Sequence, residues 1–240
     1  MEGPHDNWAK YYDYVYQSTF GDFYDGFTNQ TLGVLKSIRE SGTILDLGAG
    51  TGRFSIPLAK AGYAIIAVEK SKGMIEVMTE KSFAENIHFP MHHCSIAEYQ
   101  NGKVDLAMAV FTVLIYITEE NELHQSLQNI SEHLNPGGFF FFDLANEILF
   151  DEHMYSPVVK GSFSRNVTVR KNSEPLYTYD ETCSGVYNGE AFSYRDTFPI
   201  RQWTFSEVET ILEKCGLVRV DRHFNEFRNT GSTYHLYQKK

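Results

Sequence analysis

The chain has 240 residues and a mass of 27.5 kDa, the size of one large domain or of a domain with a sizeable insertion. With 21 basic and 31 acidic side chains it carries a net charge of −10 and no basic block, so nucleic acid is not expected as a partner. The longest nearly apolar run, residues 106–117, is too short to cross a bilayer, and the first residues do not resemble a secretory signal. Three scattered cysteines fit reduced thiols, so we expect a cytoplasmic protein without a membrane partner.

Strand-like and helix-like patterns alternate from about residue 43 to residue 144. Ser71 is a plausible N-cap for a helix that carries Met74, and apolar side chains after Thr118 recur at spacings of four, three and four. This alternation predicts an α/β fold with a Rossmann-like doubly wound sheet, covered by helices on both faces. The predicted strands are residues 43–47, 64–68, 104–111 and 139–144.

The pattern changes after Asp143 to one typical of antiparallel strands. Asn188-Gly189 predicts a two-residue hairpin turn, because both residues tolerate a positive φ. That turn sets Glu181 opposite Asp196 and Tyr179 opposite Phe198, with the aromatic side chains on one face. The aromatic face fits either a lid over a pocket or the surface of a homodimer.

A capping box at residues 204–207 then predicts a last helix that runs to Cys215, followed by closing strands. The chain is therefore divided into four parts, with an antiparallel insertion before the last helix. These are an N-terminal helical lid (1–42), a ligand-binding core (43–150), the antiparallel insertion (151–203) and the closing helix and strands (204–240).

The most informative segment is the glycine-rich loop at residues 44–52, where a strand runs into closely spaced glycines and then a helix. Such a loop lets backbone N–H groups approach a polar or anionic ligand. Its G-x-G-x-G spacing differs from the dinucleotide fingerprint, and no Lys-Ser/Thr follows as in a phosphate loop. Asp46 is placed to orient a cationic amino acid moiety, and Glu69 ends the next strand, where a carboxylate can accept both ribose hydroxyls.

In these features the sequence resembles the class I S-adenosylmethionine-dependent methyltransferases. The resemblance covers roughly residues 9–144, and its motifs lie at 45–53, 67–74, 105–116 and 134–144. It implies S-adenosylmethionine as the cofactor, with the glycines around the methionine part and Glu69 on the ribose. The cofactor-binding residues expected from it are Tyr16, Tyr24, Asp46, Gly48, Ala49, Gly50, Gly52, Glu69, Lys70, Met74, Ser95, Ile96 and Phe111.

One position departs from the family pattern. Ser95 stands where the family commonly has an Asp that accepts a hydrogen bond from the adenine amino group. A serine oxygen can still accept that bond without the charge, but the change leaves open a methyltransferase-like protein without activity. A dinucleotide-dependent oxidoreductase is a second alternative. No metal site is expected, because the neighbours in His92-His93-Cys94 point to opposite faces of a strand.

The acceptor is expected to be a small molecule, with N-methylation slightly favoured over O-methylation. Residues 111–116 lack the Asp/Asn-Pro-Pro-Tyr/Phe motif of DNA amino-methyltransferases. The aromatic N-terminal segment resembles the lid of small-molecule members of the family. We name Tyr11 from that lid, Tyr116 and Asp143 as candidate catalytic residues, Asp143 being equally compatible with a structural turn.

The opposed carboxylates of Glu181 and Asp196 allow two interpretations. Like charges on facing strand positions are destabilising unless a cation intervenes or a proton is taken up. They would suit a substrate amine among aromatic rings. The favoured alternative is neutralisation by an arginine of the chain, for which the candidates are Arg165, Arg170 and Arg222.

Overall fold

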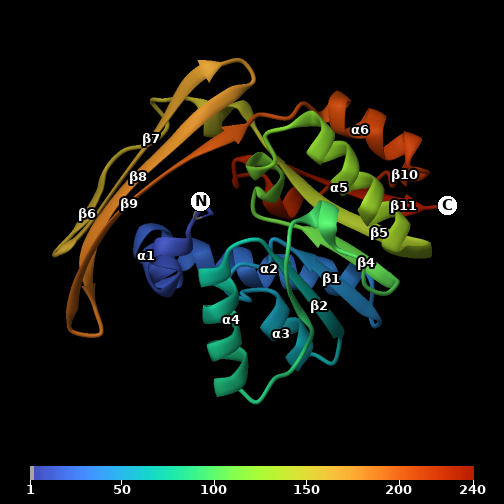
Figure 1. Ribbon diagram of the computed structural model, residues 1–240, viewed down its shortest axis with the longest axis horizontal. Helices are drawn as coiled ribbons and strands as arrows, with labels where there is room; N and C mark the ends of the chain where they lie inside the picture. The colour runs from blue at the N-terminus through green and yellow to red at the C-terminus, as the bar shows by residue number, and fades with distance from the viewer. Residues whose placement is uncertain (1–2) are drawn as a thin grey trace.

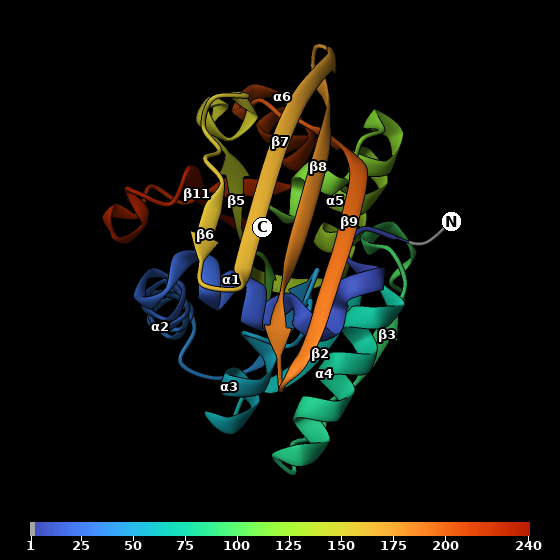
Figure 2. The same ribbon diagram turned by 90° about the vertical axis from the view of Figure 1, so that its left-hand side faces the viewer.

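The computed structural model describes residues 3–240. An α/β core is covered on one side by a curved antiparallel sheet, and the N-terminal helices lie between them (Figure 1). In a view turned by 90°, the long strands of this second sheet lie across the front of the core (Figure 2).

The core sheet has seven strands in the order β10-β11-β5-β4-β1-β2-β3. Neighbours among β1 to β5 pair in parallel, whereas β11 runs antiparallel to both β5 and β10. This arrangement confirms the predicted Rossmann-like α/β class. The strands are β1 (Thr43–Leu47), β2 (Ala64–Glu69), β3 (Met91–His93), β4 (Val104–Ala109), β5 (Leu134–Ala145), β10 (Leu217–Arg219) and β11 (Ser232–Lys239).

Helices cover both faces of this sheet. Leu35 and Leu58 pack on the face that carries Phe141, and Leu127 packs on the face that carries Phe140, because successive strand side chains point to opposite sides. The α-helices are α1 (Tyr12–Phe20), α2 (Asp22–Ile38), α3 (Ser55–Lys60), α4 (Lys72–Ala84), α5 (Glu120–His133) and α6 (Phe205–Lys214). The 3₁₀ segments are η1 (Asp6–Tyr11), η2 (Ile96–Glu98), η3 (Val113–Tyr116), η4 (Glu147–Phe150) and η5 (Asn225–Phe227).

The two predicted helix caps are confirmed. The Ser71 hydroxyl accepts from the backbone N–H of Met74, and Thr204 forms a reciprocal capping box with Glu207. The predicted strand at 104–111 ends earlier, at Ala109, because the chain then enters a left-handed turn. Within residues 3–240 no helix is long and apolar enough to cross a membrane.

The second sheet has four antiparallel strands in the order β6-β7-β8-β9. They are β6 (Val158–Lys160), β7 (Phe163–Ser173), β8 (Leu176–Tyr187) and β9 (Glu190–Arg201). Asn188 and Gly189 form the hairpin turn at φ values of 52° and 85°, and Glu181 pairs with Asp196 as predicted. The aromatic face of the hairpin turns inward, where Phe192 packs on the N-terminal helices. It therefore acts as a cover over the core.

Candidate functional site

The glycine loop wraps the carboxyl ends of β1 and β2. Gly48, Gly50 and Gly52 adopt φ values of 67°, 56° and 80°, which are conformations that glycine adopts without a steric penalty. The Glu69 carboxylate accepts from the N–H of Gly50 at 2.9 Å and from the N–H of Ser71 at 2.8 Å. The backbone of the loop and a fixed carboxylate therefore meet at one edge of the sheet.

This edge opens into a first cavity of about 150 Å³, which we call the glycine-loop cavity. It extends from the loop to the third strand and to the first described residues of the chain. The residues predicted to bind the cofactor that line it are Gly48, Ala49, Gly50, Glu69, Lys70, Met74, Ser95, Ile96 and Phe111, and Tyr116 lines it too.

Two of the predicted cofactor residues from the loop do not line either cavity. Asp46 is buried below the loop, where it accepts from the Ser55 hydroxyl at 2.6 Å, and burial raises the pKa of its carboxyl to about 7. Gly52 packs against Ile56 and Met78, so closely that a Cβ there would lie 2.9 Å from the Met78 side chain. Both residues support the loop from beneath.

Ser95 lines the glycine-loop cavity and begins the short segment η2. Its hydroxyl donates to Glu98 Oε2 at 2.7 Å, and its N–H donates to the same oxygen at 2.9 Å. The hydroxyl hydrogen is therefore committed to the cap, and the same oxygen accepts from the backbone N–H of Glu98 in a capping box, which leaves one lone pair to accept from a ligand. The departure from the family pattern leaves an acceptor in place, without charge.

A second cavity of about 480 Å³ lies between the core and the antiparallel sheet, and we call it the aromatic cavity. Asp143, Arg53 and Arg165 are its charged lining residues. Its aromatic lining consists of Tyr16, Phe20, Phe23, Tyr24, Phe27, Phe111, Tyr116, Phe150, Tyr155, Tyr179, Phe198 and Tyr234. Tyr16 and Tyr24, predicted to contact the cofactor, thus line this cavity instead of the glycine-loop cavity.

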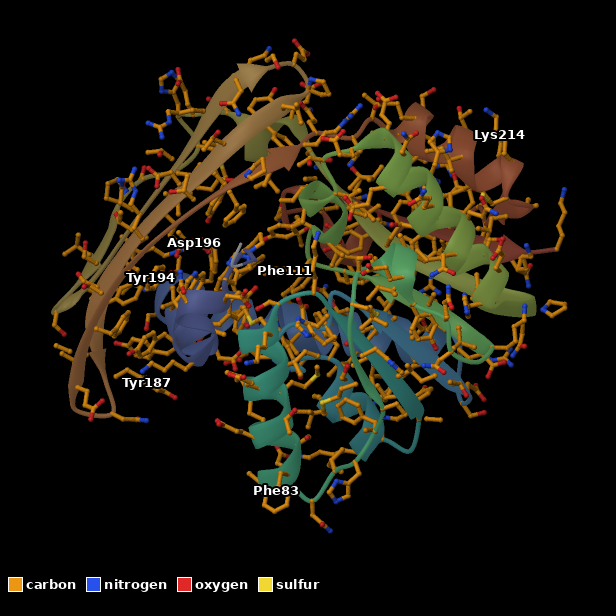
Figure 3. The ribbon with its side chains drawn as sticks, viewed as in Figure 1. Phe83, Phe111, Tyr187, Tyr194, Asp196 and Lys214 are labelled. Carbon is orange, nitrogen blue, oxygen red and sulfur yellow. The ribbon has the colours of Figure 1, made fainter. Side chains whose placement is uncertain are left out.

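Three residues line both cavities: Arg53, Phe111 and Tyr116. Phe111 lies inside the molecule between the core and the cover (Figure 3). Phe111 and Thr112 have φ values of 77° and 62°, a strained conformation for residues other than glycine. Asp143 holds this turn, because both of its oxygens accept from the N–H of Thr112, at 3.0 and 3.1 Å. Burial raises the pKa of the Asp143 carboxyl to about 6.

Arg53 is a site residue that the sequence did not reveal. Its Nε donates to the Thr28 hydroxyl, its Nη2 donates to the Tyr24 carbonyl, and the guanidinium stacks 3.7 Å above the Tyr24 ring. Its Nη1 is buried and has no hydrogen-bond partner among residues 3–240. A buried donor on a cation without a partner carboxylate fits an anionic group of a ligand. The only signal in the sequence was its position directly after the last loop glycine.

The candidate catalytic tyrosines are placed differently. Tyr116 reaches the junction of the two cavities, and its hydroxyl lies 2.9 Å from His5 Nε2. Tyr11 lies outside both cavities and stacks on Phe192 of the hairpin at 4.3 Å, whereas the next residue, Tyr12, lines the glycine-loop cavity. The N-terminal segment therefore presents to the cavity the tyrosine one position further along the chain.

The two facing carboxylates on β8 and β9 are satisfied separately. Arg165 binds both oxygens of the fully buried Glu181, at 2.9 and 2.8 Å, and Tyr179 and Tyr194 also donate to it. Burial opposes ionisation, but Arg165 holds the pKa of Glu181 below its usual range. Asp196 instead accepts from His5 and Trp8 of the N-terminal segment. Neutralisation by Arg165 is therefore confirmed, and the carboxylate pair is not an amine-binding site.

Among residues 3–240 no group of three His, Cys, Asp or Glu side chains could hold a metal ion. His93 Nε2 lies 3.1 Å from the Lys70 carbonyl, and His92 packs edge-on against the Tyr99 ring. Both contacts hold β3 in place.

Comparisons with known proteins agree with this geometry. Residues 44–138 match the profile of a family described as a methyltransferase domain. YqeM of Bacillus subtilis, assigned as a methyltransferase, is 25% identical over 211 residues, which are 85% of each chain. A solved S-adenosylmethionine-dependent methyltransferase of Clostridium acetobutylicum superimposes with a TM-score of 0.81 at 16% identity, over 96% of this chain and 98% of the other.

A second solved structure is CalS10 of Micromonospora echinaspora, described as an amino pentose methyltransferase with bound S-adenosylmethionine. It matches with a TM-score of 0.76 at 14% identity, over 95% of this chain and 96% of CalS10. At these identities the two structures show the fold, and the family profile assigns residues 44–138 to a methyltransferase domain. The predicted fold, enzyme class and cofactor are confirmed, and the dinucleotide alternative is dropped.

Proposed function

Because this chain is an S-adenosylmethionine-dependent methyltransferase, we propose that it methylates a small molecule in the aromatic cavity, on an amine nitrogen in preference to a hydroxyl. The observation that carries the proposal is the junction, where Arg53, Phe111 and Tyr116 belong to both cavities. A ligand in each cavity would meet the other ligand there and nowhere else.

The residues of the glycine-loop cavity fit the cofactor. A Cβ on Gly50 would meet nothing within 4 Å, so the loop is open towards the cavity. We propose that Glu69 accepts from the ribose hydroxyls, and that the unpartnered Nη1 of Arg53 binds the cofactor carboxylate. Lys70, Met74 and Ser95 would then lie along the ribose and adenine.

When bound, S-adenosylmethionine would supply an activated methyl group to a lone pair of the acceptor. The protein's part is then to align the acceptor and to exclude water. Phe111 and Tyr116 fix the direction of approach, since η3 and the turn held by Asp143 leave them little freedom. The antiparallel sheet closes the acceptor side with Tyr179 and Phe198.

An amine acceptor is favoured by the lining of the aromatic cavity. Aromatic rings attract a cationic ligand, and Asp143 supplies a carboxylate at one end of the cavity. The amino pentose named for CalS10 is an acceptor of the same kind on the same fold. The net charge of −10 disfavours polyanionic acceptors.

The test pairs amines with alcohols of the same carbon skeleton and follows a labelled methyl group from S-adenosylmethionine into product. We expect label on the amines, and a larger kcat/KM for each amine than for its alcohol. Calorimetric titration with S-adenosylhomocysteine, an analogue without the methyl group, confirms in parallel that the glycine-loop cavity is competent. Transfer to the alcohols alone would overturn the amine preference, and binding without transfer to either series would overturn the small-molecule assignment.

A further inference from the structure

We propose that Tyr116, His5 and Asp196 form a proton relay that removes the proton released by the acceptor during methylation. The inference rests on the proposed function and adds two residues, His5 and Asp196, to its chemistry. They come from segments far apart in the sequence: η3 after β4, the first turn of the chain, and strand β9 of the cover. These three residues are brought together only by the folding of the chain.

The first link joins Tyr116 to His5 at the junction of the cavities. Tyr116 lines both cavities, His5 lines the glycine-loop cavity, and the Tyr116 hydroxyl lies 2.9 Å from His5 Nε2. Burial raises the pKa of Tyr116 well above its usual value, so the phenol is protonated at rest. A phenol that donates to an imidazole keeps its own lone pairs free to accept a proton from the cavity.

The second link joins His5 to Asp196 and fixes the tautomer of the imidazole. Asp196 Oδ2 accepts from the backbone N–H of His5 at 2.8 Å and from the Trp8 indole at 2.9 Å, and lies 3.4 Å from His5 Nδ1. Nδ1 is buried and has no hydrogen-bond partner among residues 3–240. A lone pair on Nδ1 would face the carboxylate, so the hydrogen is favoured there, and Nε2 is left to accept from Tyr116.

The surroundings of His5 suit a transient positive charge. The rings of Trp8, Tyr12, Tyr116 and Phe198 surround the imidazole at centroid distances of 5.2 to 5.7 Å. The titratable groups that face it are Asp196 from β9, Tyr116 from η3 and Tyr12 from α1. Burial opposes ionisation of Asp196, but the hydrogen bonds from His5 and Trp8 hold its pKa below the usual range. The ionised Asp196 carboxylate therefore lies beside the His5 imidazole.

The proton balance is simple. As a neutral amine gains a methyl group, positive charge develops on its nitrogen, and in the same transition state one of its N–H bonds breaks with the electron pair left on nitrogen. The proton passes to Tyr116 Oη while the phenol proton moves to His5 Nε2, which leaves an imidazolium next to Asp196. The imidazolium then loses the proton on Nε2 to solvent through the glycine-loop cavity, which His5 lines, and Nδ1 keeps its hydrogen, so the relay returns to its resting state.

The central test is Asp196→Asn. The amide oxygen can take the place of Oδ2, which accepts from the His5 backbone and from Trp8 and also faces Nδ1. These contacts are then kept, while the negative charge that stabilises the imidazolium is lost. We expect kcat to fall about a hundredfold with KM and the affinity for S-adenosylhomocysteine changed less than about twofold. Tyr116→Phe should reproduce the loss, whether or not Asp196→Asn folds well.

The matched control is Asp180→Asn, the same chemical change on β8. Asp180 pairs with Arg195 and Arg170 and lines neither cavity, so kcat should stay unchanged.

A second readout does not depend on turnover. Nitrogen NMR of histidine-labelled protein, with the His5 signal assigned from His5→Gln, should show hydrogen on Nδ1 and none on Nε2 in the unaltered protein. Hydrogen on Nε2 in the unaltered protein, or an unchanged kcat in both Asp196→Asn and Tyr116→Phe, would overturn the relay. If the proposed acceptor is wrong, amines fail as substrates while the tautomer result is unaffected, so the two failures are distinguishable.

Discussion

The two cavities that meet at Phe111 are built from different parts of the polypeptide. The loop side of the glycine-loop cavity is made largely by backbone: loop N–H groups, glycine conformations and the Glu69 carboxylate, which accepts from the N–H groups of Gly50 and Ser71. The aromatic cavity is made by side chains from α1, α2, η4, the antiparallel sheet and β11. The glycine loop is a short local motif, although residues between 3 and 122 line its cavity, whereas the aromatic cavity has no such motif and is lined by residues between 16 and 234.

This difference assigns separate tasks to the two regions. Backbone groups present the same donors whatever the neighbouring side chains are, which suits a cofactor that does not vary. A lining of aromatic side chains changes with each substitution, which suits the choice of acceptor. The junction residues Arg53, Phe111 and Tyr116 contact both cavities, and two neighbouring residues with positive φ, Phe111 and Thr112, lie there.

The largest expected effect tests whether the cover is held by its own buried charges. Glu181→Gln leaves Arg165 without a counter-ion and should lower the free energy of unfolding by about 3–5 kcal/mol. Denaturant unfolding measures this loss. Glu76→Gln, which removes an exposed pair with Lys72, is the control and should cost less than about 1 kcal/mol. Equal losses in both variants would show that the cover is not held in this way.

The next effect concerns the pH dependence that Asp143 confers. Because burial raises its pKa from 3.8 to about 6, the folded protein keeps a proton that the unfolded chain releases. The free energy of unfolding should therefore fall as the pH rises from 3.8 to about 6, by about 3 kcal/mol from this group, and stay low above that. Asp143→Asn, which cannot ionise, should escape this loss in unfolding measured from pH 4 to pH 7.

Asp105 provides a control of opposite sign. The Thr43 N–H is the main cause of a lowered pKa there, so the unfolded chain binds the proton more readily and the contribution to stability grows as the pH rises. Asp105→Asn should remove that gain. The same pH trend in both variants would contradict the assignment of the Asp143 effect to burial.

A smaller effect tests whether a substitution in the glycine loop lowers cofactor affinity, and does not only strain the backbone. Gly48→Ala forces a side chain into a φ of 67° and sets its Cβ 2.9 Å from both Cγ atoms of Val113, a lining residue. We expect the affinity for S-adenosylmethionine to fall about tenfold, from roughly 1–2 kcal/mol of strain and displacement. Gly62→Ala, at φ 92° with nothing within 4 Å, should cost stability but not affinity when both are titrated calorimetrically.

The smallest effect concerns the departure at Ser95. Asn is as good an N-cap through its side-chain oxygen, and its NH₂ has one hydrogen for Glu98 and a second that can point towards the cavity. Ser95→Asn should therefore tighten S-adenosylmethionine binding by a factor of about two to five, equivalent to about one further hydrogen bond. Weaker binding would indicate that the serine cap is already the better fit.

Local chemistry explains why the fold was predictable from sequence. The hairpin register followed from two independent constraints, the turn at Asn188-Gly189 and the alternation of aromatic residues, and it holds from residue 176 to residue 201. The helix caps at Ser71 and Thr204 are likewise contained within four residues. The glycine loop belongs to the same class of signal.

The candidate site was less accessible because its contacts span the chain. His5 meets Tyr116 and Asp196 across separations of 111 and 191 residues, which no local pattern reveals. Tyr11 and Tyr12 show why the sequence did not identify the tyrosine that faces the cavity. Successive residues in a helical segment are rotated by about 100°, and consecutive aromatic residues do not indicate which side of the helix faces the cavity. One step along the chain moves a ring from the hairpin to the cavity.

The close packing of the N-terminal segment on helix α4 depends on Gly73, a residue that can be recognised in an amino-acid sequence. The N–H of Gly73 donates to Asp6, and a Cβ there would lie 2.6 Å from the Asp6 carbonyl oxygen. Helix α4 thus carries in its first turn a residue that weakens helices, because the N-terminal backbone must approach so closely. Chains with a bulky residue at this place must route their first residues elsewhere and cannot seat a histidine as this one does. The residue at a single helix position would therefore sort relatives into two groups from their amino-acid sequences alone.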